Sequence, residues 1–244
     1  MVELETVSHE PARGSAKVET TDPFAWPFAQ NESDFVPPKA NILYNSGIFK
    51  KLTPRGFVWL VSAFSSVSGL LFGLDVGIIS GALLFMESTF HLTPTQQEVV
   101  ISIVLVGSFV GSLTGCWLSD RYGRWFTILI ATLSYLVGAL LMTFSVTTSL
   151  WMIYIGRLVI GYAIGVSTLT VTLYLAEVAP ASARGAIVSV NEVAIVTGIF
   201  LSFFLNWSVA GLGDTKAWRT AFGISAIPAA LQVLGMFFLP YSPR

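Results

Sequence analysis

The sequence GFVWLVSAFSSVSGLLFGLDVGIISGALLF runs from Gly56 to Phe85 and contains a single charged residue, Asp75. About 20 consecutive, mainly apolar residues are enough for an α-helix to cross the hydrocarbon core of a bilayer. This stretch is longer than that, and its glycines predict a helix that is tilted or broken. We therefore interpret it as a membrane-spanning helix.

Five further stretches of the same kind follow at short intervals, and the links between them are short and polar. Six spanning helices predict an all-α membrane protein and leave no room for a soluble catalytic domain. The five stretches are Glu98 to Leu118, Phe126 to Val146, Leu150 to Tyr174, Ala186 to Trp207, and Trp218 to Leu239.

The composition agrees with a chain that is surrounded by lipid. Hydrophobic residues make up 54% of the 244 residues and charged residues only 11%, against about 25% in a typical soluble domain. The net charge of −1 offers no surplus of Lys and Arg for nucleic acid. One cysteine and two distant histidines predict neither a metal site nor a cofactor.

The basic residues of the links predict the orientation. Lys and Arg occur before the first stretch, between the second and third, between the fourth and fifth, and after the sixth, whereas the opposite links are poor in them. Positively charged links stay in the cytosol, so both termini are expected there. Residues 1–55 are polar and acidic and predict a disordered cytosolic tail, and we expect the protein in the plasma membrane.

Small residues recur at every fourth position in two of the predicted helices. Gly107, Gly111 and Gly115 do so in the second stretch, and Gly161 and Gly165 in the fourth. This spacing lets helix backbones approach closely, and it predicts packing rather than a substrate.

Charged residues inside the apolar stretches are the functional candidates, because each costs at least about 2.5–3.5 kcal/mol at mid-bilayer. Asp75 in the first stretch and Arg157 in the fourth invite pairing, and an acid that exchanges its partner for a proton can switch a conformation. The alternative is a permanent ion pair that only fixes the helix register. Glu192 in the fifth stretch fits either a cavity ligand or an interfacial carboxylate.

Seven motifs occur in the order typical of one family. Together they resemble the sugar porter family of the major facilitator superfamily, and Glu192, where most members have Gln, resembles the animal class III glucose (hexose) transporters. The motifs are GLLFGLDVGIISGALL (Gly69 to Leu84), DRYGR (Asp120 to Arg124), GRLVIGYAIG (Gly156 to Gly165), YLAEVAPASARG (Tyr174 to Gly185), SVNEVAIVTGI (Ser189 to Ile199), WRTAFG (Trp218 to Gly223) and PYSPR (Pro240 to Arg244).

The resemblance implies a fold and a function. Residues 56–244 would form the amino-terminal six-helix half of the major facilitator fold, built from a 3+3 inverted repeat. The full-length protein would carry a monosaccharide across the membrane, with proton symport as one option, and would be no enzyme.

The resemblance also assigns roles to individual residues. A first group lines the sugar site: Phe72, Glu192, Ile195 and Ile199. A second group, Asp75 and Arg157, couples a proton to the sugar. A third group forms a charge network that gates the cytosolic side: Asp120, Arg121, Gly123, Arg124, Glu177, Arg184 and Arg244. Trp125 stands where the family has a basic residue, and Tyr241 where it has a glutamate, so this network is expected to be weaker.

The chain stops at Arg244, where the family continues into six further helices. Three interpretations follow: a fragment, a truncation product with a regulatory role, or a half-transporter that works as a dimer. A non-transporting partner that binds full-length transporters is the alternative function. A six-span channel fits less well, because the link from Ser208 to Lys216 is too short for a pore loop.

Overall fold

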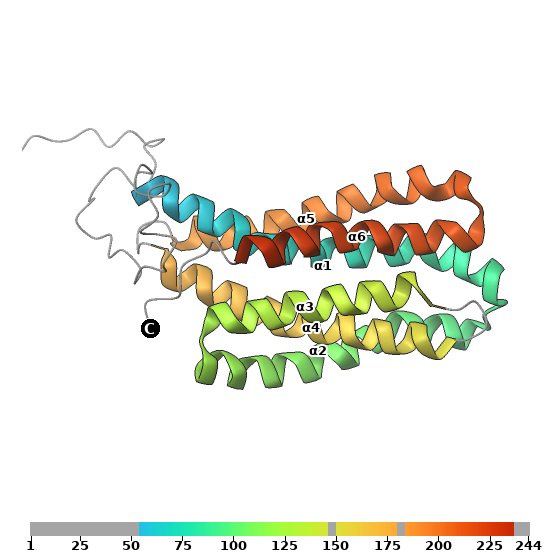
Figure 1. Ribbon diagram of the computed structural model, residues 1–244, viewed down its shortest axis with the longest axis horizontal. Coiled ribbons are helices and arrows are strands. Elements are labelled where there is room, and N and C mark those ends of the chain that lie inside the picture. The colour runs from blue at the N-terminus through green and yellow to red at the C-terminus, as the bar shows by residue number, and fades with distance from the viewer. Residues whose placement is uncertain (1–53, 146–149, 180–183, 237–244) are drawn as a thin grey trace, which may run out of the picture.

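The computed structural model describes residues 54–145, 150–179 and 184–236. Most of the predicted tail and the PYSPR motif therefore lie outside the described residues. The described chain is a bundle of six long α-helices (Figure 1). They are α1 (Pro54–Phe90), α2 (Pro94–Tyr122), α3 (Arg124–Thr143), α4 (Leu150–Val178), α5 (Arg184–Val209) and α6 (Asp214–Met236), with a short 3-10 turn (Ala210–Leu212) before α6. Each predicted stretch corresponds to one of these helices.

Five of the six helices, α1 to α5, are long and apolar enough to cross a membrane by length and composition. Within the described residues α6 is not among them. It begins four residues earlier than predicted, at Asp214, and so includes Lys216 and Arg219. Its polar Ser225 and Gln232 are buried in the bundle, which explains how a less apolar helix fits there.

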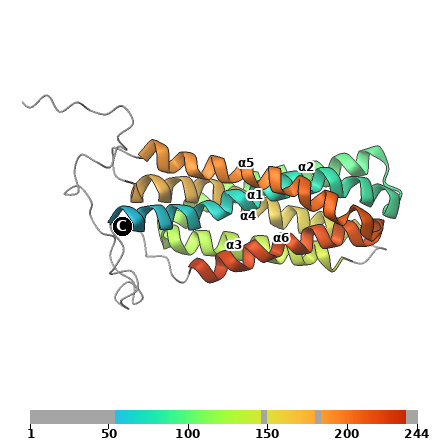
Figure 2. The ribbon, with the colours of Figure 1, turned by 90° about the horizontal axis from the view of Figure 1, so that it is seen from above.

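The helices form three layers of two (Figure 2). The outer layers are α2 with α5 and α3 with α6, and the central layer is α1 with α4. The closest pairings are α2 with α4, α1 with α5, α3 with α4, α1 with α6, and α3 with α6. Exchanging α1, α2 and α3 for α4, α5 and α6 leaves this set of pairings unchanged, as a 3+3 repeat requires.

The chain reverses direction at each link, so α1 begins and α6 ends at one end of the bundle (Figure 1). We call this the proximal end and the opposite one, where α1 ends at Phe90, the distal end. Local sequence explains two of the reversals. Thr93 and Gln96 form a capping box that starts α2 at the distal end. Gly123 has φ +88° and separates α2 from α3 at the proximal end, which is a conformation that glycine adopts without strain.

The predicted glycine contacts hold the two central helices against the outer layer. A methyl group on Gly161 or Gly165 of α4 would overlap the backbone of α2 at Val104 or Ser108. On α1, Gly73 meets the backbone of Ile195 in α5 in the same way. The interpretation of the α2 and α4 glycines as packing residues is confirmed, and α1 with α5 repeats the arrangement.

Candidate functional site: a buried ion pair and a charge network

The two charged residues of the central layer form an ion pair. Arg157 Nη1 of α4 donates to Asp75 Oδ1 of α1 at 2.6 Å, and the two side chains are 2% and 1% exposed. Arg157 Nε also donates to the Val100 carbonyl of α2 at 3.4 Å. The pair therefore joins the first helices of the two repeats inside the bundle, where both side chains are almost completely buried.

The stability of a pair in these surroundings depends on its charge state. With both groups charged, the contact offsets the cost of burial, and removing one partner costs about 3–5 kcal/mol because the other charge is left alone. If Asp75 takes up a proton, the guanidinium of Arg157 loses its counter-charge and has to find another partner. The geometry thus links the protonation of one carboxyl to the contact between α1 and α4.

Two small cavities lie on the proximal side of this pair. Each has a volume of about 10 Å³, which is about enough for one water molecule. The inner cavity lies between α1, α3, α4 and α6. The lateral cavity lies between α1, α4 and α5. The polar side chains of the inner cavity are Ser68, Thr132, Tyr135, Ser167 and Gln232. Those of the lateral cavity are Ser68, Ser167, Thr168 and Asn191.

The four residues assigned to the sugar are brought together only in part. Phe72 and Ile195 are half-buried and both line the lateral cavity. Glu192 lies on α5 with its side chain exposed, and Ile199 is half-buried one turn beyond Ile195. Neither lines that cavity. The carboxylate of Glu192 is therefore accessible from outside the bundle, on the exposed face of α5.

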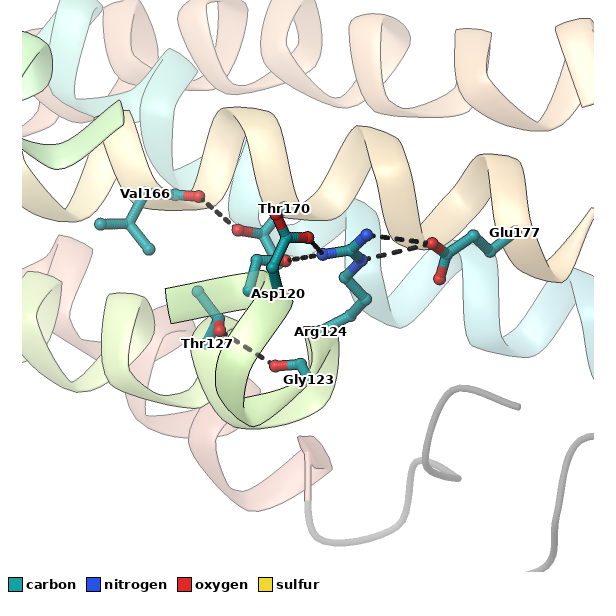
Figure 3. A network of polar contacts seen from close by, with 8 residues as sticks. Asp120, Gly123, Arg124, Thr127, Val166, Thr170 and Glu177 are labelled. Carbon is teal, nitrogen blue, oxygen red and sulfur yellow. Dashed lines mark hydrogen bonds and ion pairs between the residues drawn. The ribbon is translucent and has the colours of Figure 1, made fainter. Parts of the chain in front are cut away.

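A second cluster of charges sits at the proximal end, where α2, α3 and α4 meet (Figure 3). Arg124, which is 8% exposed, lies at its centre. Its Nη1 donates to Asp120 Oδ1 at 2.9 Å, and its Nε and Nη2 donate to Glu177 Oε1 at 3.3 and 3.2 Å. The hydroxyl of Ser119 also accepts from Nη1, at 2.5 Å. One guanidinium thus ties three helices together.

The remaining members assigned to this network do not join it in the described residues. Arg121 is exposed, with its guanidinium 5.7 Å from the centre of the Trp117 ring. Gly123 contributes the turn and no charge. Arg184 is exposed at the start of α5 and forms no ion pair with a described residue. Arg244 lies outside the described residues.

Several polar contacts were not predicted. Ser119 completes the coordination of Arg124, Gln232 Nε2 donates to Ser68 Oγ, and Asn206 Nδ2 donates to the Gly77 carbonyl at 2.9 Å. Trp125, which replaces a basic residue, donates from Nε1 to the Met236 carbonyl at 2.7 Å. Trp125 therefore fastens the start of α3 to the end of α6.

Comparison with known proteins identifies the type of bundle. Residues 61–244 match the family model described as "Sugar (and other) transporter". The mouse "Solute carrier family 2, facilitated glucose transporter member 12" is 40% identical over 191 residues, which cover 78% of this chain and 30% of that protein. The Arabidopsis thaliana "Probable inositol transporter 3" is 38% identical over 191 residues, covering 77% and 32%.

Solved structures agree with the sequence comparison. The bundle superimposes on the xylose transporter XylE from E. coli with a TM-score of 0.72 and 25% identity, covering 77% of this chain and 51% of that one. A second structure of XylE, described as a proton:xylose symporter of the major facilitator superfamily bound to 6-bromo-6-deoxy-D-glucose, also gives 0.72 and 25%, covering 78% and 46%. The chain thus spans about a third of the curated relatives above and about half of the solved transporter.

Proposed function

This chain belongs to the sugar transporter family of the major facilitator superfamily, and on that premise we propose that it forms the first six-helix half of a membrane carrier for a monosaccharide. It is an integral membrane protein that crosses the bilayer several times, and its relatives are transporters and not enzymes. The proposal adds that a second six-helix half completes the sugar site, because in this fold the substrate binds between two halves near the midplane.

Support for a sugar-facing surface comes from α1 and α5. Phe72 and Ile195 border the same small cavity, and Glu192 presents an exposed carboxylate on α5. A carboxylate accepts hydrogen bonds from the hydroxyl groups of a sugar, and apolar side chains beside it suit the C–H faces of the ring. We propose that Phe72, Glu192, Ile195 and Ile199 contact the sugar.

Proton coupling is proposed for the buried pair, and the pair is the observation that carries it. Asp75 and Arg157 are almost completely buried and meet at 2.6 Å between the two repeats. Burial makes either charge costly alone, so a proton on Asp75 would weaken the contact between α1 and α4. A proton gradient can then drive the sugar uphill. We propose the cluster around Arg124 as the gate that opens when the halves move.

The orientation belongs to the same proposal. The proximal end carries Arg121, Arg124 and Arg184, and we place it in the cytosol of a plasma-membrane protein. The charge network would then close or open the cytosolic side.

The test is uptake of radiolabelled glucose into transporter-deficient cells. The chain is expressed alone and together with the second half of a full-length relative, and its presence at the surface is confirmed. We expect saturable uptake, competed by unlabelled glucose, in the co-expressing cells. Asp75→Asn should abolish accumulation against a gradient while sugar exchange stays measurable. Unchanged uphill uptake in Asp75→Asn would remove this residue from the coupling role.

The same experiment judges the alternative of a non-transporting partner. If neither culture takes up sugar although the chain reaches the surface, the carrier proposal fails. Co-purification of the chain with a full-length relative, absent when the two are mixed only after solubilisation, would then support the assembly role. Unlabelled glucose, xylose and inositol serve as competing substrates, because the similar proteins are named as transporters of these three different compounds.

A further inference from the structure

Three buried hydroxyl groups form a track along α1 on the proximal side of Asp75, and a gap separates the track from Asp75. Ser62, Ser65 and Ser68 follow one another at three-residue spacing on α1, and all three are at most 5% exposed. Asp75 is the tenth residue after Ser65, which is about 15 Å along the helix. Hydroxyl groups that face one side of a helix at this spacing are neighbours along it.

The inner cavity fills the gap between this track and Asp75. It lies between Ser68 on α1, Thr132 and Tyr135 on α3, and Gln232 on α6. The Gln232 side chain is 1% exposed, and its Nε2 donates to Ser68 Oγ. Its Oε1 is buried and has no hydrogen-bond partner among the described residues, and the same holds for Ser65 Oγ.

Tyr135 lines the cavity and interacts electrostatically with both members of the ion pair. Its hydroxyl donates to the Leu71 carbonyl at 3.2 Å, one helical turn before Asp75, so its oxygen is still able to accept. Among the described residues, Tyr135 on α3 and Arg157 on α4 are the ionisable groups that interact electrostatically with Asp75. On α6, Gln232 lines the cavity and Ser225 lies beside the Tyr135 hydroxyl, and neither of these side chains titrates.

We propose that the inner cavity binds one water molecule, held by Gln232 Oε1, and that this water links Asp75 to the proximal end as a proton relay. An unpartnered, buried amide oxygen at a polar cavity of this size is a favourable site for water. The route runs inside the six-helix bundle, and its cavity shares Ser68, Phe72 and Ser167 with the lateral cavity, whereas Glu192 is exposed on α5. It rests on the proposed coupling role of Asp75.

The relay conserves atoms and charge. In the proposed relay the protonated carboxyl of Asp75 gives its proton to an oxygen of the Tyr135–water–Ser68 chain, each oxygen of that chain passes one of its own protons to the next, and solvent water that enters from the proximal end takes up the proton that leaves Ser68. One proton leaves at the proximal end. Asp75 remains as a carboxylate and pairs with Arg157. Only O–H bonds form and break.

Hydroxyl-radical footprinting of the chain in nanodiscs tests the water site, because a bound water promotes oxidation of the side chains beside it. Tyr174 is an internal control, since it is 2% exposed and Tyr135 is 3% exposed. We expect Tyr135 to oxidise at least about fivefold faster than Tyr174. The length-matched Gln232→Met and the isosteric Thr132→Val should reduce this ratio, whereas Ser202→Ala, a buried hydroxyl on α5, should not. Equal oxidation of the two tyrosines in the unaltered chain would overturn the water site.

Transport assays then test the relay. They use the form of the protein, the chain alone or the chain with a second half, in which sugar exchange is measurable. In Gln232→Met we expect sugar counterflow within about twofold and proton-driven accumulation reduced about tenfold or more. If Gln232→Met removes the faster oxidation of Tyr135 but keeps full proton-driven accumulation of sugar, the relay is wrong and the coupling role of Asp75 still stands. Counterflow without proton-driven accumulation in the unaltered protein would instead overturn coupling and relay together, while footprinting still decides the water site.

Discussion

The pair in the central layer and the cluster at the proximal end use the same kinds of side chain in different surroundings. Asp75 and Arg157 are 1% and 2% exposed and share a single close contact. Around Arg124, the Asp120 and Glu177 side chains are 68% and 20% exposed, and the guanidinium divides its donors between them and Ser119. Among the described residues, Arg157 has one carboxylate and the more distant Val100 carbonyl as acceptors, whereas Arg124 has two carboxylates and a hydroxyl.

This difference fits the two tasks that we propose for these sites. A buried single contact responds strongly to the loss of one charge, and a proton is the smallest agent that removes one. A partly exposed contact with several acceptors can break stepwise, with water replacing each partner at little cost. The buried pair therefore suits the sensing of a proton, and the cluster suits a gate that opens repeatedly.

Arg157→Ala should have the largest effect on stability. It leaves Asp75 charged and unpaired in the bundle, which costs about 3–5 kcal/mol. We expect the largest fall in melting temperature of all the variants considered, measured by thermal unfolding in detergent. The neutral double variant Asp75→Asn/Arg157→Met should recover at least half of the loss. A double variant as unstable as Arg157→Ala would mean that side-chain volume, and not charge, explains the effect.

Arg124→Ala should rank second, with a loss of about 1.5–3 kcal/mol for the hydrogen bonds to charged partners. Its partners lie close enough to the surface to be hydrated, so the loss stays below that of Arg157→Ala. Arg124→Lys keeps the charge but lacks the planar fork that reaches both carboxylates, and it should recover only part of the loss. The same thermal unfolding assay checks both. A loss larger than that of Arg157→Ala would contradict the comparison.

The sequence predicts the buried pair because a charge in an apolar stretch is costly. Asp75 and Arg157 stand out against their neighbours, and a carboxylate and a guanidinium of this kind are expected to meet. The helices are predicted from their long apolar stretches. However, α1 runs to Phe90 and α2 starts at Pro94, several residues beyond the predicted borders. The cap at Thr93 starts α2 earlier than predicted, and residues predicted as a link continue the helix α1.

The uncharged polar partners were not predicted, because their cost depends on which way a helix faces. Ser119, Ser68 and Gln232 look like ordinary interruptions of an apolar stretch, and only packing of α1 against α6 and of α2 against α3 brings them to their partners. Arg121 and Arg124 look equivalent in sequence. The turn at Gly123 directs Arg124 into the bundle and leaves Arg121 outside.

Within the cluster, Glu177→Gln should cost more than Asp120→Asn. Glu177 accepts two bonds from Arg124 and is 20% exposed, whereas Asp120 accepts one and is 68% exposed. We expect about 1–2 kcal/mol for Glu177→Gln. For Asp120→Asn we expect less than about 0.5 kcal/mol. Raising the salt from 0.1 to 1 M shortens the Debye length from about 10 to 3 Å, and it should weaken the Asp120 contact more than the Glu177 contact.

Arg121→Ala should have the smallest effect, within about 0.5 kcal/mol of the unaltered chain. Arg121 lies two residues before Gly123 and three before Arg124, carries the same charge, and differs in being exposed, with its guanidinium near the Trp117 ring. Its cation–π contact is exposed and close to the distance limit, so it contributes about 0.5 kcal/mol, and the apolar stem of the arginine offers little burial to lose. If charge at the proximal end were enough to hold α2, α3 and α4 together, Arg121→Ala and Arg124→Ala would lower the melting temperature alike. A clear separation between the two would mean that the position set by the Gly123 turn, and not the charge, makes Arg124 the centre of the cluster.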